Sequence, residues 1–127
     1  MTDLLALAAE IEALTGPDMD MNTRIAWRLL YPTADESPEP GTEFYTAISR
    51  GIPRYTKSID AAYALGRELF PGWAIDMWCR DTANASVIPP TGSESPFFQG
   101  RAPTLPLAIC AAVVRAVAQS RTLTRNP

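Results

Sequence analysis

The sequence predicts a single α+β domain in which α-helices pack on a small antiparallel β-sheet. Apolar residues recur at helical spacing near both ends of the chain, and from Trp73 onward they alternate along the chain as in a strand. The 127 residues are enough for one hydrophobic core and too few for two ordinary domains. We therefore treat residues 1–127 as one domain.

Two helices are expected at the N-terminal end. The first covers residues 2–14, with Thr2 as its cap, and the Gly-Pro pair that follows ends it. The second starts at Asp18 or Asp20 and continues to about Leu30. Apolar residues one turn apart form its buried side. These residues are Met21, Ile25 and Leu29.

An acidic, proline-rich loop is expected within the domain over residues 32–53. This stretch contains four prolines and four carboxylate residues, a composition typical of exposed loops. A short strand or a helical turn over residues 43–48 is an alternative. A loop of this length in a compact domain is either functional or mobile.

The central segment predicts a helix, a sharp stop and then a strand. Ser58 is the expected N-cap, and Pro71 and Gly72 end the helix. The apolar stripe of this helix consists of Ile59, Ala62, Tyr63, Gly66, Leu69 and Phe70. One face of the strand that follows carries Trp73, Ile75, Met77 and Cys79, and the other carries Ala74, Asp76, Trp78 and Arg80.

Two further strands and a long helix complete the expected fold. A hairpin turn over residues 81–84 leads to a second strand over residues 85–88, and a third covers residues 97–102. The last helix opens at Thr104 or Leu105 and frays after Thr122. Its apolar face consists of Leu105, Ile109, Ala112, Val113, Ala116 and Val117, with Arg115 and Arg121 facing out.

The composition argues against several functional classes. A net charge of −3 argues against a general nucleic-acid binder. The chain has no histidine, which removes Ser-His and Cys-His catalysis and most zinc sites. We therefore expect a non-enzymatic protein with no metal and no cofactor. Cys79 and Cys110 are expected to be reduced core residues.

The chain carries no signal for a membrane or for secretion. No apolar run approaches the roughly 18 residues of a membrane span, and the acidic first residues lack a basic n-region. We expect a cytoplasmic protein without a membrane anchor.

Aromatic and arginine residues near helix starts form the candidate ligand-binding set. Bases stack on aromatic rings, and phosphates accept hydrogen bonds from Arg and from helix N-termini. The candidates are Arg54, Tyr55, Trp78, Arg80, Phe98 and Arg101. Alternatively, Trp78 and Phe98, with Phe97, are core or dimer-interface residues and the arginines form surface ion pairs. An open sheet face would instead expose Trp78 and Arg80 as a partner-binding patch.

Three phrases resemble a known family. PRYTKSIDAAYAL (residues 53–65), FPGW (70–73) and RAPTLPLAICAAVVRAV (101–117) occur in the order and spacing of the phage ABA sandwich domain. The resemblance covers residues 55–117, and the chain departs from the family in the loop before Pro53 and in the Pro-rich segment at 89–97. It implies an α-β-α sandwich and an origin in a tailed phage or prophage.

The resemblance and the lack of a catalytic group predict a phage accessory protein that acts by binding. We expect a homo-oligomer in the host cytoplasm that sequesters a host immune nucleotide signal in counter-defence. One alternative is an inhibitor of a host defence protein such as a CRISPR effector, with residues 35–43 mimicking nucleic acid. Another is a structural phage protein without a ligand.

Overall fold

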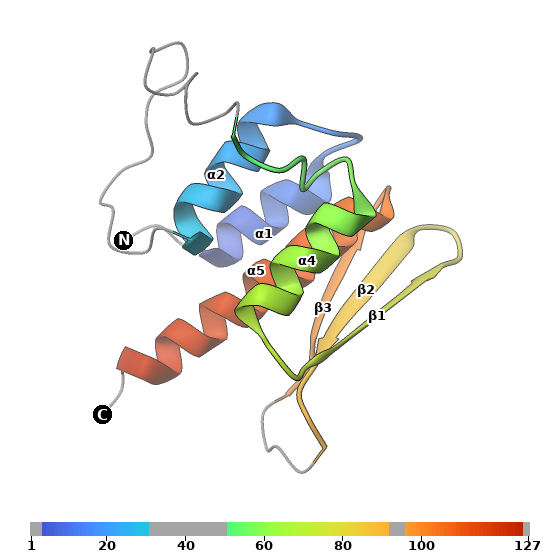
Figure 1. Ribbon diagram of the computed structural model, residues 1–127. Helices are drawn as coiled ribbons and strands as arrows, with labels where there is room; N and C mark the ends of the chain where they lie inside the picture. Colours follow the sequence, from blue (N-terminus) through green and yellow to red (C-terminus); the bar gives the residue numbers. More distant parts are fainter. Residues whose placement is uncertain (1–3, 31–50, 92–95, 126–127) are drawn as a thin grey trace.

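The computed structural model describes residues 4–30, 51–91 and 96–125 (Figure 1). Their elements are helices α1 (Leu4–Ala13), α2 (Met19–Leu30), α4 (Ile59–Leu69) and α5 (Leu105–Arg125), and strands β1 (Ala74–Cys79), β2 (Ala83–Ile88) and β3 (Phe98–Ala102). The α+β class, with helices packed on a small antiparallel sheet, is confirmed. The predicted Thr2 cap and the loop prediction for residues 32–50 lie outside the described residues.

The three strands form a meander in the order β1-β2-β3, and both pairings are antiparallel. Because side chains alternate along a strand, the sheet has an inner face toward α5 and an outer face away from it. Inner-face residues of β2, such as Ala85 and Val87, are fully buried. The pairing places Trp78 beside Asn84, and Asn84 beside Arg101, in one row of the outer face.

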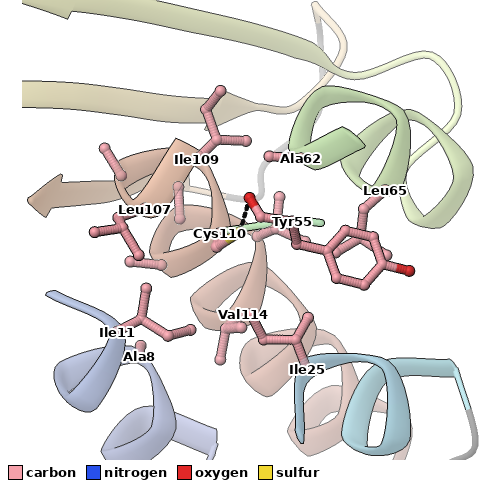
Figure 2. Close-up of a cluster of buried hydrophobic side chains, with 14 of the residues drawn as sticks. Ala8, Ile11, Ile25, Tyr55, Ala62, Leu65, Leu107, Ile109, Cys110 and Val114 are labelled. Carbon is pink, nitrogen blue, oxygen red and sulfur yellow. Dashed lines mark hydrogen bonds between the residues drawn. The ribbon is translucent and has the colours of Figure 1, made fainter. Parts of the chain in front are cut away.

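Helix α5 lies at the centre of the molecule and contacts every other described element. Each residue from Leu107 to Val114 has no exposed surface, so this part of the helix is buried on all sides rather than on one apolar face as expected (Figure 2). In the described part of the chain the sheet lies on one side of α5, and α1, α2 and α4 lie around the rest of it (Figure 1). The described helices α1, α2, α4 and α5 therefore lie on one side of the sheet (Figure 1).

Small residues let α5 and β3 approach each other closely. A Cβ atom added to Gly100 would lie 2.0 Å from the Ala108 carbonyl oxygen and 2.7 Å from the Ala112 nitrogen. Real Cβ atoms never approach backbone atoms to these distances, so the strand can cross the helix here only as glycine. The alanines of α5 at 108, 111 and 112 complete the contact.

The predicted starts of α2 and α4 are confirmed, whereas α5, which was expected to fray after Thr122, continues to Arg125. The Asp18 carboxylate accepts the Met21 N–H at 2.8 Å at the start of α2, and the Ser58 hydroxyl accepts the Ala61 N–H at 3.1 Å at the start of α4. Gly72, with φ of 86°, adopts the left-handed conformation that favours glycine after α4 ends.

Two sequence predictions about burial are wrong. Ile59 and Tyr63 are exposed by 41% and 37%, whereas Leu65 is buried, because α4 turns its Ala62–Leu65–Gly66 side toward the core. Cys79 lies in the strand at a position that should face the core, as Ile75 and Met77 do, but it is exposed. It is the last residue of edge strand β1, which has few contacts with α5.

Cys110 is a core residue, as predicted. Its thiol is fully buried and donates to the Tyr55 carbonyl at 3.4 Å (Figure 2). Burial raises the pKa of this thiol to about 12, so it stays protonated and unreactive at neutral pH.

A buried polar network joins the start of α2 to the segment before α4. The Asn22 side-chain oxygen accepts the Thr56 N–H at 2.9 Å and lies 2.8 Å from the Thr56 hydroxyl, which also accepts the Asp18 N–H at 2.8 Å. These bonds connect the chain segments on either side of residues 31–50, and all of them involve one threonine.

Thr56→Val is therefore expected to lower the free energy of unfolding by about 1.5 kcal/mol, because Asn22 and Asp18 each lose a partner in a buried site. The matched control is Thr15→Val at an exposed position. Urea denaturation of both variants checks the expectation, and equal midpoints for the two would contradict it.

Candidate functional site

The candidate site is the outer face of the sheet, which consists of Asp76 and Trp78 on β1, Asn84 and Ser86 on β2, and Gln99 and Arg101 on β3. These residues form two rows across the strands, Trp78–Asn84–Arg101 and Asp76–Ser86–Gln99. No helix among the described elements lies on this face (Figure 1). Ser86, in the middle of this face, is only 3% exposed. The exposed part of the face has an aromatic ring at one edge strand and a cation at the other.

Trp78 and Arg101 are the two sequence candidates that the sheet brings into one row. Trp78 is 40% exposed. The Arg101 side chain is exposed, and its Nε donates to the Thr82 hydroxyl at 3.1 Å. Within the described residues this bond uses Nε and leaves the two terminal amino groups of the guanidinium to an anion. Two strand spacings separate the two residues by about 10 Å.

Arg80 lies at the end of this face, in the hairpin between β1 and β2. Its backbone N–H donates to the Thr82 carbonyl at 3.1 Å, and its side chain is exposed. Arg54 is also exposed, but it lies in the segment before α4, where its carbonyl accepts the Ser58 N–H at 2.9 Å.

The other two candidates do not reach the outer face. Tyr55 is only 3% exposed and packs in the core beside α5 (Figure 2). Phe98 has the opposite alternation to Arg101, and its ring stacks on Trp73 with centroids 6.4 Å apart. Phe98 therefore belongs to the inner face, while its neighbour Phe97 is 56% exposed.

An ion pair that the sequence analysis missed closes the far side of the site. The Glu12 carboxylate accepts two hydrogen bonds of 2.6 Å from the Arg115 guanidinium and a third, of 2.8 Å, from the Arg101 N–H. Arg115 also donates to the Gln99 carbonyl at 2.7 Å. These contacts fix the backbone of β3 on both sides of Gly100. Arg115, which was expected to face out, is thus half-buried in an ion pair.

Two carboxyl groups of the described residues have lowered pKa values because they form ion pairs. The Arg115 hydrogen bond lowers the pKa of Glu12, and the Arg24 hydrogen bond lowers the pKa of Glu10. A general acid at neutral pH needs the opposite shift. In the residues that the structure describes, no cluster of three or more His, Cys, Asp or Glu residues has the arrangement of a metal site.

A shallow groove between α1 and α2 is a weaker candidate. Its volume is about 240 Å³, and it is lined by Glu10, Asp18, Asp20 and Arg24 together with apolar residues. Arg24 already pairs with Glu10 at 2.7 Å. The groove therefore presents excess negative charge and suits neither a phosphate nor a stacked base.

Comparison with models of protein families, with curated proteins and with solved structures gives no match to this chain. The resemblance to the phage ABA sandwich domain thus stays a prediction. None of the helices in the described ranges has both the length and the apolar character to cross a membrane.

Proposed function

We propose that this protein binds a nucleotide on the outer face of its sheet and thereby sequesters it, without transforming it. The observation that carries the proposal is the Trp78–Asn84–Arg101 row, in which an exposed indole and an exposed guanidinium flank an amide. Together with the resemblance to phage proteins, the row supports a counter-defence role against a host nucleotide signal.

Each residue of the row suits one part of a nucleotide. A base stacks on the indole of Trp78, a contact worth about 1–3 kcal/mol. The free amino groups of Arg101 donate to a phosphate as a planar fork. Asn84 lies between them with both a donor and an acceptor, which suits a base edge or a sugar hydroxyl.

The absence of histidine and the lowered carboxyl pKa values support holding over turnover. Among the described strand residues of the outer face, the one carboxylate is that of Asp76, which lies in the other row of side chains. A ligand that binds across Trp78 and Arg101 therefore meets no adjacent pair of acid and base.

Calorimetric titration with cyclic ADP-ribose, cyclic di-AMP, cyclic di-GMP and AMP tests the proposal. We expect at least one of them to bind, and to be recovered chemically unchanged by chromatography after incubation. Trp78→Ala and Arg101→Gln are each expected to weaken binding by about tenfold or more, because each removes one of the two contacts.

Matched controls are available on α4, away from the sheet face. Tyr63 is an exposed aromatic residue, and the Arg67 guanidinium lies 6.0 Å from its ring centroid. Tyr63→Ala and Arg67→Gln should leave the binding constant unchanged. The absence of binding heat for every probe with folded protein, or equal weakening by the control variants, would refute the proposal.

A further inference from the structure

The two edges of the sheet, formed by β3 and by β1, differ in whether side chains bind their outward-facing main-chain groups. At the β3 edge, Glu12 accepts the Arg101 N–H and Arg115 donates to the Gln99 carbonyl, so side chains occupy main-chain groups that another strand would need. At the β1 edge, the Arg67 guanidinium donates to the Trp73 carbonyl at 3.5 Å, one residue before the strand, and no described side chain occupies a main-chain group of β1 itself. Unpaired strand edges are sites for pairing with a further strand, and proteins usually block those they do not use.

A hydrogen bond in the hairpin shows which residues of β1 direct their N–H and C=O groups to the free edge. The Arg80 N–H donates to the Thr82 carbonyl, toward β2. The N–H and C=O groups of successive residues point to opposite sides of an antiparallel strand. The residues of β1 whose groups point to the free edge are therefore Ile75, Met77 and Cys79. The same alternation across β2 and β3 points the N–H and C=O groups of Gln99 and Arg101 to the β3 edge. The hydrogen bonds of these groups with Glu12 and Arg115 agree with this direction.

The side chains on the outer face of β1 are complementary to themselves. Asp76, Trp78 and Arg80 alternate as anion, aromatic ring and cation, and all three are exposed. Neither Asp76 nor Arg80 forms an ion pair with another described residue. When such a strand is turned around a two-fold axis through Trp78, each charge lies opposite a charge of the other sign.

We propose that two copies of this chain form a symmetric dimer in which β1 pairs antiparallel with β1 of the second copy. In this register Trp78 lies opposite the partner's Trp78, and Asp76 lies opposite the partner's Arg80. Met77 and the partner's Cys79 exchange main-chain hydrogen bonds. The sheets of the two copies become one continuous sheet with a shared outer face.

Charge selects this register among those that the backbone allows. Because only every second residue of β1 directs its main-chain groups to the edge, the two strands can shift relative to each other only in steps of two residues. One such shift places Asp76 opposite the partner's Trp78, and the shift in the other direction places Arg80 there. Only the register centred on Trp78 forms two opposite-charge pairs, and such cross-strand pairs are stabilising, whereas like charges are destabilising.

A charge-swap experiment tests the dimer by sedimentation equilibrium. We expect the wild-type protein to be dimeric, and Asp76→Arg or Arg80→Asp alone to weaken dimerisation by about tenfold or more, because each places two like-charge pairs in the interface. The double variant D76R/R80D restores opposite charges and should recover the wild-type dimer. Both positions are exposed, and circular dichroism verifies that the variants fold.

Cysteine cross-linking tests the register. In a Cys79→Ser background, Trp78→Cys should form a disulfide-linked dimer on mild oxidation, because residues on the two-fold axis form a closely spaced pair. Gln99→Cys in the same background is the matched control, since it is an exposed position on β3, and it should stay monomeric under denaturing electrophoresis.

A monomeric wild-type protein at the highest attainable concentration overturns the proposal, whether the edge is then free or accepts a strand of another protein. Equal cross-linking at residues 78 and 99, or no rescue by the double swap, also overturns it. The dimer does not depend on a ligand. All measurements are made without nucleotide, so their outcome is separate from that of the titrations.

Discussion

Gly100→Ala is expected to lower the free energy of unfolding by about 3 kcal/mol or more, because the added methyl group has no room. The new Cβ atom would meet the Ala108 carbonyl oxygen at 2.0 Å and the Ala112 nitrogen at 2.7 Å. Both are backbone atoms of the part of α5 that is buried on all sides, so neither can move away alone. Differential scanning calorimetry should show a melting temperature lower by roughly 10 °C or more.

Two other glycines are matched controls for this substitution. Gly16 has no atom within 4 Å of an added Cβ, so Gly16→Ala should change stability by less than about 0.5 kcal/mol. At Gly66 the nearest atom is the Ile75 Cδ1 at 2.6 Å, the end of a flexible side chain, so Gly66→Ala should have an intermediate effect. A Gly100→Ala variant as stable as Gly16→Ala would contradict the close approach of β3 and α5.

Glu12→Gln is expected to lower the free energy of unfolding by about 2 kcal/mol, because it removes the charge that holds Arg115 and the Arg101 N–H. Glu10→Gln is the matched control on the same helix. Its partner Arg24 lies in a more exposed pair, with side chains 35% and 54% exposed against 29% and 23% for Arg115 and Glu12. The control should cost no more than about 0.5 kcal/mol.

The same ion pair predicts a pH dependence. Arg115 holds the pKa of Glu12 below its ordinary value of 4.5 in the folded protein. A carboxyl group with a lowered folded pKa stabilises the fold above its unfolded pKa and loses this effect as the pH falls through the folded pKa. Urea denaturation should therefore show a wild-type advantage over Glu12→Gln that is constant at neutral pH and shrinks below pH 4.5. An advantage independent of pH would exclude the charge as its cause.

Local signals in the sequence predicted the starts of α2, α4 and α5, because helix caps depend on a few neighbouring residues. Ser58 caps α4 and Pro106 lies in the first turn of α5, as expected. The buried faces were harder to predict. Alanine-rich α5 has apolar residues on most of its surface, and a sequence pattern does not say how many neighbours surround it.

The outer-face row depends on the turn between β1 and β2, which the sequence analysis placed incorrectly. A turn over residues 81–84 would pair Arg80 with Ala85 and place Trp78 beside Val87. The structure instead pairs Cys79 with Ala83 and Trp78 with Asn84. The partner of Trp78 therefore differs by three positions. A change in register by an odd number of residues brings side chains of the other face beside the indole, so the position of the turn decides what surrounds it.

The ion pair of Glu12 and Arg115 had no signal in the sequence at all. The two residues are 103 positions apart, and charges on amphipathic helices usually face solvent. The contact arises because α1 packs along α5 at the β3 edge, where an anion and a cation can occupy main-chain groups of the strand. Only tertiary packing reveals such a contact.

The central position of α5 has a consequence for biosynthesis. Ribosomes release the chain from its N-terminal end at about 5–20 residues per second, and α5 follows every other described element. Until its residues Leu107–Val114 emerge, the apolar sides of α1, α4 and the sheet have nothing to enclose. The nascent polypeptide must therefore pass through an interval with open apolar surfaces, during which chaperones compete with self-association for it.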